Sequence, residues 1–125
     1  MPGQLGDYAE ALSSCGAALA VYRELGNRPA AAATLDSLGY AYHHLGRHRE
    51  AIASYRRALE VHGDAADRHL RAEMLTHLGD AHQASGDHAA AHSTWRTALA
   101  ILDQLGHPDA GPVRSRLSAP APARS

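Results

Sequence analysis

Apolar residues recur every three or four positions along most of the chain, which is the spacing of one face of an α-helix. Between residues 27 and 46 this face carries Leu35, Leu38, Tyr42 and Leu45. Gly46 interrupts the pattern, and a second apolar line starts near His48. That line consists of Ala51, Tyr55, Ala58 and Leu59. The pattern therefore predicts two helices joined by a short turn.

Small polar residues stand where such helices should begin. Asn27, Asp67 and Asp87 each precede a helical stretch, and their side chains can accept a backbone N–H of the first turn. Near the N-terminus, Asp7 is followed three residues later by Glu10, which is the spacing of a capping box. We therefore expect helices after residues 27, 67 and 87, and a further helix that begins at Asp7.

A shift of forty residues aligns the middle of the chain with the part that follows it. Ten residues between positions 35 and 59 are identical in the aligned copy. A glycine in each first helix, Gly39 or Gly79, is accompanied by a large ring in the second helix, Tyr55 or Trp95. A residue without a side chain lets two helices approach closely, and the ring fills the adjoining space. The chain thus contains a repeated helix pair.

The repeat divides the chain into segments. We expect a lead at residues 1–6, a half repeat at 7–26, full repeats at 27–66 and 67–106, and a short capping helix at 109–117. Together the repeats and the capping helix form one domain over residues 7–117. Residues 118–125 are rich in Pro, Ala and Ser, a composition typical of a disordered tail.

Composition favours a helical protein. Of the 125 residues, 27 are Ala and 15 are Leu, whereas Val, Ile and Thr together number nine and Phe is absent. Strands draw on β-branched and aromatic residues, while Ala and Leu favour helices. The sequence therefore predicts an all-α fold.

The repeated residues resemble the tetratricopeptide repeat. The family pattern is met by Leu38-Gly39, Tyr42, Gly46, Ala51, Tyr55 and Ala58-Leu59. It recurs as Leu78-Gly79, His82, Gly86, Ala91, Trp95 and Ala98-Leu99, with His82 where the family has an aromatic residue. The forty-residue period exceeds the usual period of about 34, which corresponds to about one extra turn of helix. The resemblance implies a short right-handed solenoid of antiparallel helix pairs that binds a protein or peptide in a concave groove lined by the first helices.

The sequence of residues 25–60 also resembles the C-terminal repeat arrays of actinobacterial nucleotide-switch regulators of the antibiotic-regulator type. Two functions follow from these resemblances. The first is a non-catalytic scaffold for protein–protein interaction in a bacterial regulatory system. The alternative is a detached sensor or inhibitory segment of a nucleotide-switch transcriptional regulator.

No residue pattern indicates an enzyme or a bound cofactor. The chain has no Lys, which excludes a phosphate-loop ATPase and Schiff-base chemistry. His88 and His92 have helical spacing, but no third ligand completes a metal site beside them. Cys15 lies on an apolar helix face without an acid–base pair to activate it. We therefore expect no catalytic residue and no metal site.

Polar residues of the first helices line the expected groove, about 100° around each helix from its apolar face. They are Asp36, Tyr40, His43 and His44 in one repeat, and Glu73, Thr76, Asp80 and Gln83 in the next. This stripe is mildly acidic and contains a tyrosine ring, so it suits a protein or peptide segment that carries Arg or Lys. The alternative is an ordinary solvated helix face.

Charge and hydropathy narrow the choice of partner. The formal net charge of −1 provides no general attraction to nucleic acid or to an anionic membrane, and no run of about 20 apolar residues occurs. A single Cys fits a reducing compartment, so we expect a cytoplasmic protein. The first helix has no partner helix before it, which predicts self-association through that helix, contact with another protein, or a place in a longer array.

Overall fold

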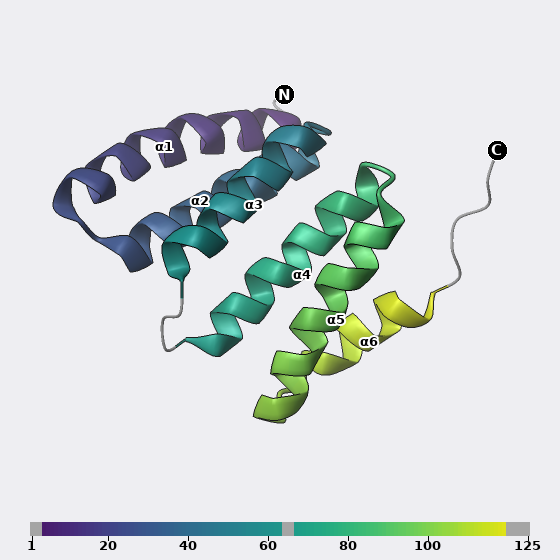
Figure 1. The fold of residues 1–125 in the computed structure, drawn as a ribbon. Helices are drawn as coiled ribbons and strands as arrows, with labels where there is room; N and C mark the ends of the chain where they lie inside the picture. The colour runs from purple at the N-terminus through teal and green to yellow at the C-terminus, as the bar shows by residue number, and fades with distance from the viewer. Residues whose placement is uncertain (1–3, 64–66, 120–125) are drawn as a thin grey trace. The chain divides into compact units, whose positions relative to one another are not determined.

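The computed structural model describes residues 4–63 and 67–119, and those two ranges contain six α-helices and no strand (Figure 1). The helices are α1 (Gln4–Leu25), α2 (Arg28–His44), α3 (His48–His62), α4 (Arg68–Ala84), α5 (His88–Leu105) and α6 (Ala110–Ser118). The all-α fold expected from the sequence is confirmed.

The chain divides into two compact units, residues 1–66 and 67–125. In the first unit α2 packs against both α1 and α3. In the second unit α5 packs against both α4 and α6. The predicted end of a repeat at residue 66 lies outside the described residues, because α3 ends at His62 and the description resumes at Asp67.

Each unit has a core built from the apolar faces that the sequence indicates. In the first unit Leu35 and Leu38 of α2 are buried, as is Tyr55 of α3. The equivalent positions of the second unit are also buried, namely Leu75, Leu78 and Trp95. Burial of one such side chain contributes about 1.5–3 kcal/mol, so these faces hold the helix pairs together.

Glycine permits the close approach of the paired helices in both units. A Cβ added at Gly39 would lie 2.6 Å from a ring carbon of Tyr55. At Gly79 an added Cβ would overlap the ring of Trp95 in the same way. The predicted role of these two glycines is confirmed, since each aromatic ring lies where a side chain would otherwise stand.

The predicted cap residues start three of the helices. The side chains of Asn27, Asp67 and Asp87 each accept the backbone N–H three residues further on, at 2.9–3.2 Å. The prediction for the first helix is wrong, because α1 begins at Gln4 and Asp7 lies within its first turn. The positive end of the helix dipole also stabilises an acidic side chain in the first turn. An acidic residue near the start of a helix therefore does not show whether it is the cap or lies in the first turn.

The last helix, α6, begins at Ala110 and contains Pro112 as its third residue. An N–H in the first turn has no partner within the helix, so proline is tolerated there. The ends of the chain are only partly described: residues 4–6 of the expected lead belong to α1, and Ser118 of the expected tail belongs to α6. Residues 1–3 and 120–125, which complete those two predicted segments, lie outside the described residues.

None of the helices in the described residues combines the length and the apolar character that a membrane span requires.

Candidate functional site

The eight residues predicted to line a groove fall into two sets, one in each unit. Four of them lie on α2, namely Asp36, Tyr40, His43 and His44. The other four lie on α4, namely Glu73, Thr76, Asp80 and Gln83. Each set lies within one unit, and a single groove formed by both of them stays a prediction.

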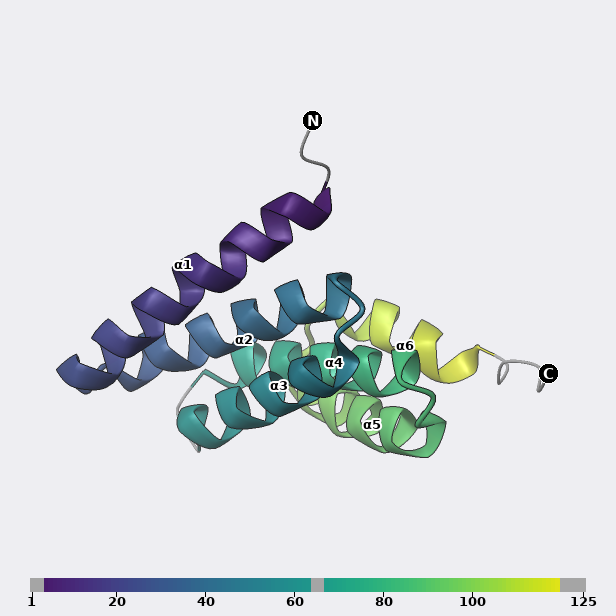
Figure 2. The same cartoon turned by 90° about the horizontal axis from the view of Figure 1, so that it is seen from above.

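Aromatic rings from two helices gather around Tyr40 in the first unit. The Tyr8 ring of α1 stacks on the His44 ring, with centroids 4.8 Å apart and planes 10° from parallel. Tyr40 meets His44 edge to face at 4.2 Å, and Tyr8 at 6.2 Å. Figure 2 shows that α1 and α2 diverge toward the start of α1. The stacked rings of Tyr8 and His44 connect these two helices.

Tyr40 and His44 of this cluster are exposed to solvent, and Tyr8 is partly exposed. Tyr40 is 46% exposed, although large hydrophobic side chains usually favour burial. Asp36 precedes Tyr40 by one helical turn, so the two residues lie on the same side of α2. We call Tyr8, Asp36, Tyr40 and His44 the α2 patch.

The sequence did not identify Tyr8 as a member of this patch. Tyr8 lies in the first helix, where Leu19 is the one large apolar side chain that is buried among the described residues of α1. The missing information is the rotation of α1 about its own axis, which depends on packing against α2.

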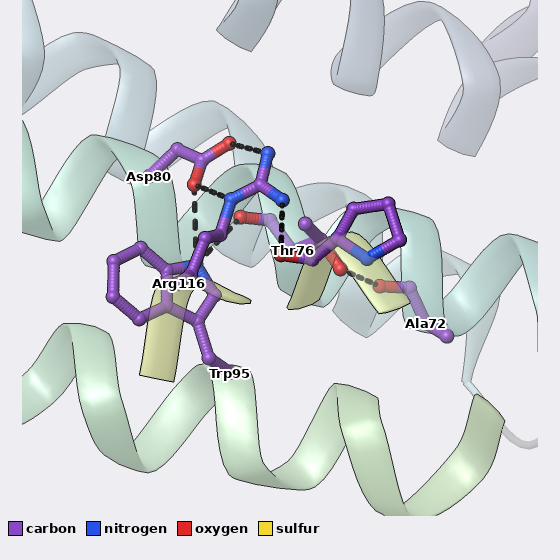
Figure 3. A network of polar contacts seen from close by, with 6 residues as sticks. Ala72, Thr76, Asp80, Trp95 and Arg116 are labelled. Atoms are coloured by element: carbon purple, nitrogen blue, oxygen red, sulfur yellow. Dashed lines mark hydrogen bonds and ion pairs between the residues drawn. The ribbon is translucent and has the colours of Figure 1, made fainter. Parts of the chain in front are cut away.

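In the second unit Asp80 is at the centre of a polar network (Figure 3). Arg116 of α6 donates from Nε to Oδ1 of Asp80 at 2.7 Å and from Nη2 to Oδ2 at 3.2 Å. The indole Nε1–H of Trp95 points at Oδ1 of Asp80, at 3.2 Å, and at the backbone oxygen of Thr76, at 3.3 Å. The network therefore joins α4, α5 and α6.

Two further groove candidates of α4 also have partners within the unit. The hydroxyl of Thr76 donates to the backbone oxygen of Ala72 at 2.8 Å. Gln83 lies with its Oε1 at 2.6 Å from the Nδ1 of His88, a distance at which the imidazole N–H donates. His88, one half of the histidine pair considered as a metal ligand set, is thus engaged by an amide.

Beside this network α4, α5 and α6 enclose a groove of about 170 Å³. Its polar lining comes from His69, Glu73, Thr76, His77, Asp109 and Arg116, and its apolar lining from Leu102, Pro112 and Val113. Glu73, the fourth groove candidate of α4, is exposed at this place. The groove is small and is partly covered by α6.

A cluster of two histidines and one aspartate lies at the end of this groove. Nε2 of His69, in the first turn of α4, is 2.9 Å from Oδ2 of Asp109. Nδ1 of His107 is 3.5 Å from the same oxygen, and the two imidazole rings stack with centroids 4.1 Å apart. The hydrogen bond to Asp109 raises the pKa of His69 above its ordinary value, and the same bond lowers the pKa of Asp109.

The forty-residue repeat contains the signal that relates these residues. His69 and Asp109 are forty positions apart and therefore occupy equivalent places at the starts of successive first helices. Equivalent positions of adjacent repeats lie side by side when repeats stack.

Cys15 is half-buried in α1, and the neighbouring Ser13 and Ser14 are exposed. Cys15 and Ser14 line a shallow, open depression together with residues of α2. Neither has an acid–base partner among the hydrogen bonds found for the described residues. The expectation that the chain is not an enzyme stays a prediction.

The family model of the tetratricopeptide repeat matches residues 3–64, a stretch that contains α1, α2 and α3. The match supports a tetratricopeptide repeat protein, in agreement with the motif residues noted in the sequence. Repeats of this family generally mediate protein–protein interactions. No curated protein matches the chain.

Proposed function

We propose that the chain is a protein-binding module and that the α2 patch binds a segment of another protein that carries arginine or lysine. The observation that carries this proposal is the half-exposed Tyr40, which is surrounded by the rings of Tyr8 and His44 and lies one turn from Asp36. A tyrosine face attracts a cation, and a carboxylate beside it adds charge-assisted hydrogen bonds.

The second unit contains an internal example of this recognition. Asp80 aligns with Tyr40 in the forty-residue repeat, and its carboxylate is engaged at both oxygens by the guanidinium of Arg116. The face of α4 thus accommodates an arginine of α6 with two parallel hydrogen bonds. This contact supports the view that basic side chains suit the corresponding face of α2.

The test compares the proteins that an immobilised full-length chain retains from a bacterial lysate, identified by mass spectrometry. We expect Asp36→Arg and Tyr40→Ala to lose at least one specific partner at low salt, because each removes half of the cation-binding pair. Glu60→Arg is the matched control, since it makes the same charge change at an exposed position of α3. Equal retention by all the variants would show that the α2 patch is not the binding surface.

The biological setting that we propose is a bacterial regulatory system. Its support is the similarity of residues 25–60 to repeat arrays of nucleotide-switch regulators. The alternative, a segment that controls a nucleotide-switch regulator, needs a nucleotide-binding domain encoded directly upstream. The neighbouring coding sequence therefore distinguishes recruitment of a separate partner from control of a linked domain.

A further inference from the structure

We propose that His69, His107 and Asp109 form a binding site for one Zn²⁺ ion at the junction of α4 with the turn between α5 and α6. The three residues offer two imidazole nitrogens and a carboxylate oxygen, and these ligand atoms all lie within 4.8 Å of one another. Two imidazoles with one carboxylate are a ligand set that zinc takes in proteins, with water in the fourth position.

Two of the three distances between ligand atoms are close to those around a tetrahedral ion. Bonds of about 2.0–2.1 Å from zinc to nitrogen and oxygen give edges of about 3.3–3.4 Å between ligand atoms in a tetrahedron. Oδ2 of Asp109 is 2.9 Å from Nε2 of His69 and 3.5 Å from Nδ1 of His107. Both of these edges need changes of only a few tenths of an ångström. The two stacked imidazoles must turn so that the plane of each ring contains the ion, because an imidazole nitrogen binds a metal in its ring plane.

The hydrogen bonds show which nitrogen of His107 carries a lone pair. The backbone N–H of Asp109 points at Nδ1 of His107 at 3.1 Å, so Nδ1 is the acceptor nitrogen of that ring. A metal binds a nitrogen through this same lone pair, and zinc would take the place of the amide hydrogen bond. At Nε2 of His69 the ion would replace the proton that this nitrogen shares with Asp109.

Access and charge also favour an ion at this position. The side chains of His69 and His107 are 38% and 34% exposed, so the ion reaches them from solvent without an opening of the fold. Glu73 follows His69 by one helical turn and lines the same groove, which adds a second negative charge near the site. The ion would connect the start of α4 to the turn that precedes α6.

The test is a titration of the full chain with ZnCl₂ at pH 7.5, after treatment with EDTA and desalting, followed by calorimetry. We expect one Zn²⁺ per chain with micromolar affinity, and a loss of at least about tenfold in His69→Ala and in His107→Ala. His92→Ala is the matched control, because it removes one histidine of the helical pair formed with His88 and should bind zinc as the wild type does. Circular dichroism checks the helix content of every variant.

A second measurement tests the proposal even if an alanine variant does not fold. Asp109→Asn keeps the shape of the side chain and removes the anionic ligand, so the absorption bands of bound Co²⁺ seen with the wild type should weaken or shift in this variant. Zinc should also raise the unfolding temperature of the wild type more than that of Asp109→Asn. No binding to the wild type, equal binding by the His69 and His107 variants, or loss of binding in His92→Ala would overturn the proposal.

Discussion

At the scale of single residues, the contact between glycine and an aromatic ring determines how closely the helices of each pair approach. Tyr55 is 1% exposed and Trp95 is 4% exposed, so neither ring can move into solvent to make room for a larger neighbour. Gly39 and Gly79 are therefore required by packing, and their helical backbone does not need glycine's conformational freedom. A glycine inside a helix otherwise lowers helix stability by about 1 kcal/mol relative to alanine.

The variant Gly39→Ala tests this contact. The added Cβ forces Tyr55 to shift, and overpacking of this kind costs about 1–3 kcal/mol, which exceeds the gain of about 1 kcal/mol in helix propensity. We expect a net loss of up to about 2 kcal/mol in the free energy of unfolding, measured by urea denaturation.

Gly16→Ala is the control for that measurement. Gly16 lies within α1 with no atom within 4 Å of an added Cβ, so only the helix propensity changes. This variant should stabilise the protein by up to about 1 kcal/mol. An equal gain in stability for both variants would mean that Tyr55 does not restrict position 39.

The sequence predicts contacts that depend on spacing and misses contacts that depend on helix rotation. Gly39 with Tyr55, and the caps formed by Asn27 and Asp67, follow from periodicity and local chemistry. The stacking of Tyr8 on His44 does not, because it requires the orientation of α1 against α2. Local pattern therefore describes the core of a helix pair better than it describes its exposed face.

At the scale of elements, α6 contacts one of the α4 residues that the sequence predicts to bind a partner. The sequence predicts a short capping helix at 109–117, and the structure has α6 over Ala110–Ser118. It did not show that Arg116 of this helix would engage Asp80 of α4, a residue assigned to the groove. Such a contact joins residues 36 positions apart and depends on where α6 lies against α5.

The variant Arg116→Ala tests the attachment of α6. Both side chains of the Arg116–Asp80 pair are about two-thirds buried, so loss of the paired hydrogen bonds should exceed the effect of an exposed ion pair. We expect faster amide hydrogen exchange across residues 110–118, with α5 changed much less.

Arg114→Ala provides the comparison from the same helix. Arg114 donates to Asp103 at 2.8 Å, but more than half of each side chain is exposed. Exposed pairs of this kind contribute only about 0–1 kcal/mol, so exchange in α6 should change little. If the two variants had the same exchange rates, the contact with Asp80 would not be what holds α6 in place.

At the scale of the whole molecule, composition and repeat length were enough to predict an all-α chain of helix pairs. They do not relate the two units to each other, because the forty-residue period shows which positions are equivalent and not the angle at which one repeat packs on the next. A continuous groove that contains both Asp36 and Glu73 accordingly stays a prediction. The α2 patch lies entirely within the first unit and does not depend on that groove.

Self-association through α1 is also a property of the whole molecule. Val21 and Leu25 of α1 are 52% and 72% exposed, and burial of these side chains against a second copy would be favourable. We expect light scattering after gel filtration to give a mass that rises above the 13.2 kDa of one chain as concentration increases. The double variant Val21→Glu, Leu25→Glu should stay at the monomer mass, and a wild type that is monomeric at every concentration would contradict this prediction.

The central claim, that the α2 patch contacts a protein partner, is tested most directly by photo-crosslinking. A benzoylphenylalanine at position 40 replaces Tyr40 with another aromatic side chain, and the same group at position 60 of α3 serves as the control. The account predicts that illumination in a lysate links position 40, and not position 60, to a defined protein through a segment that contains arginine or lysine. No crosslinked protein at position 40, or the same products at both positions, would contradict it.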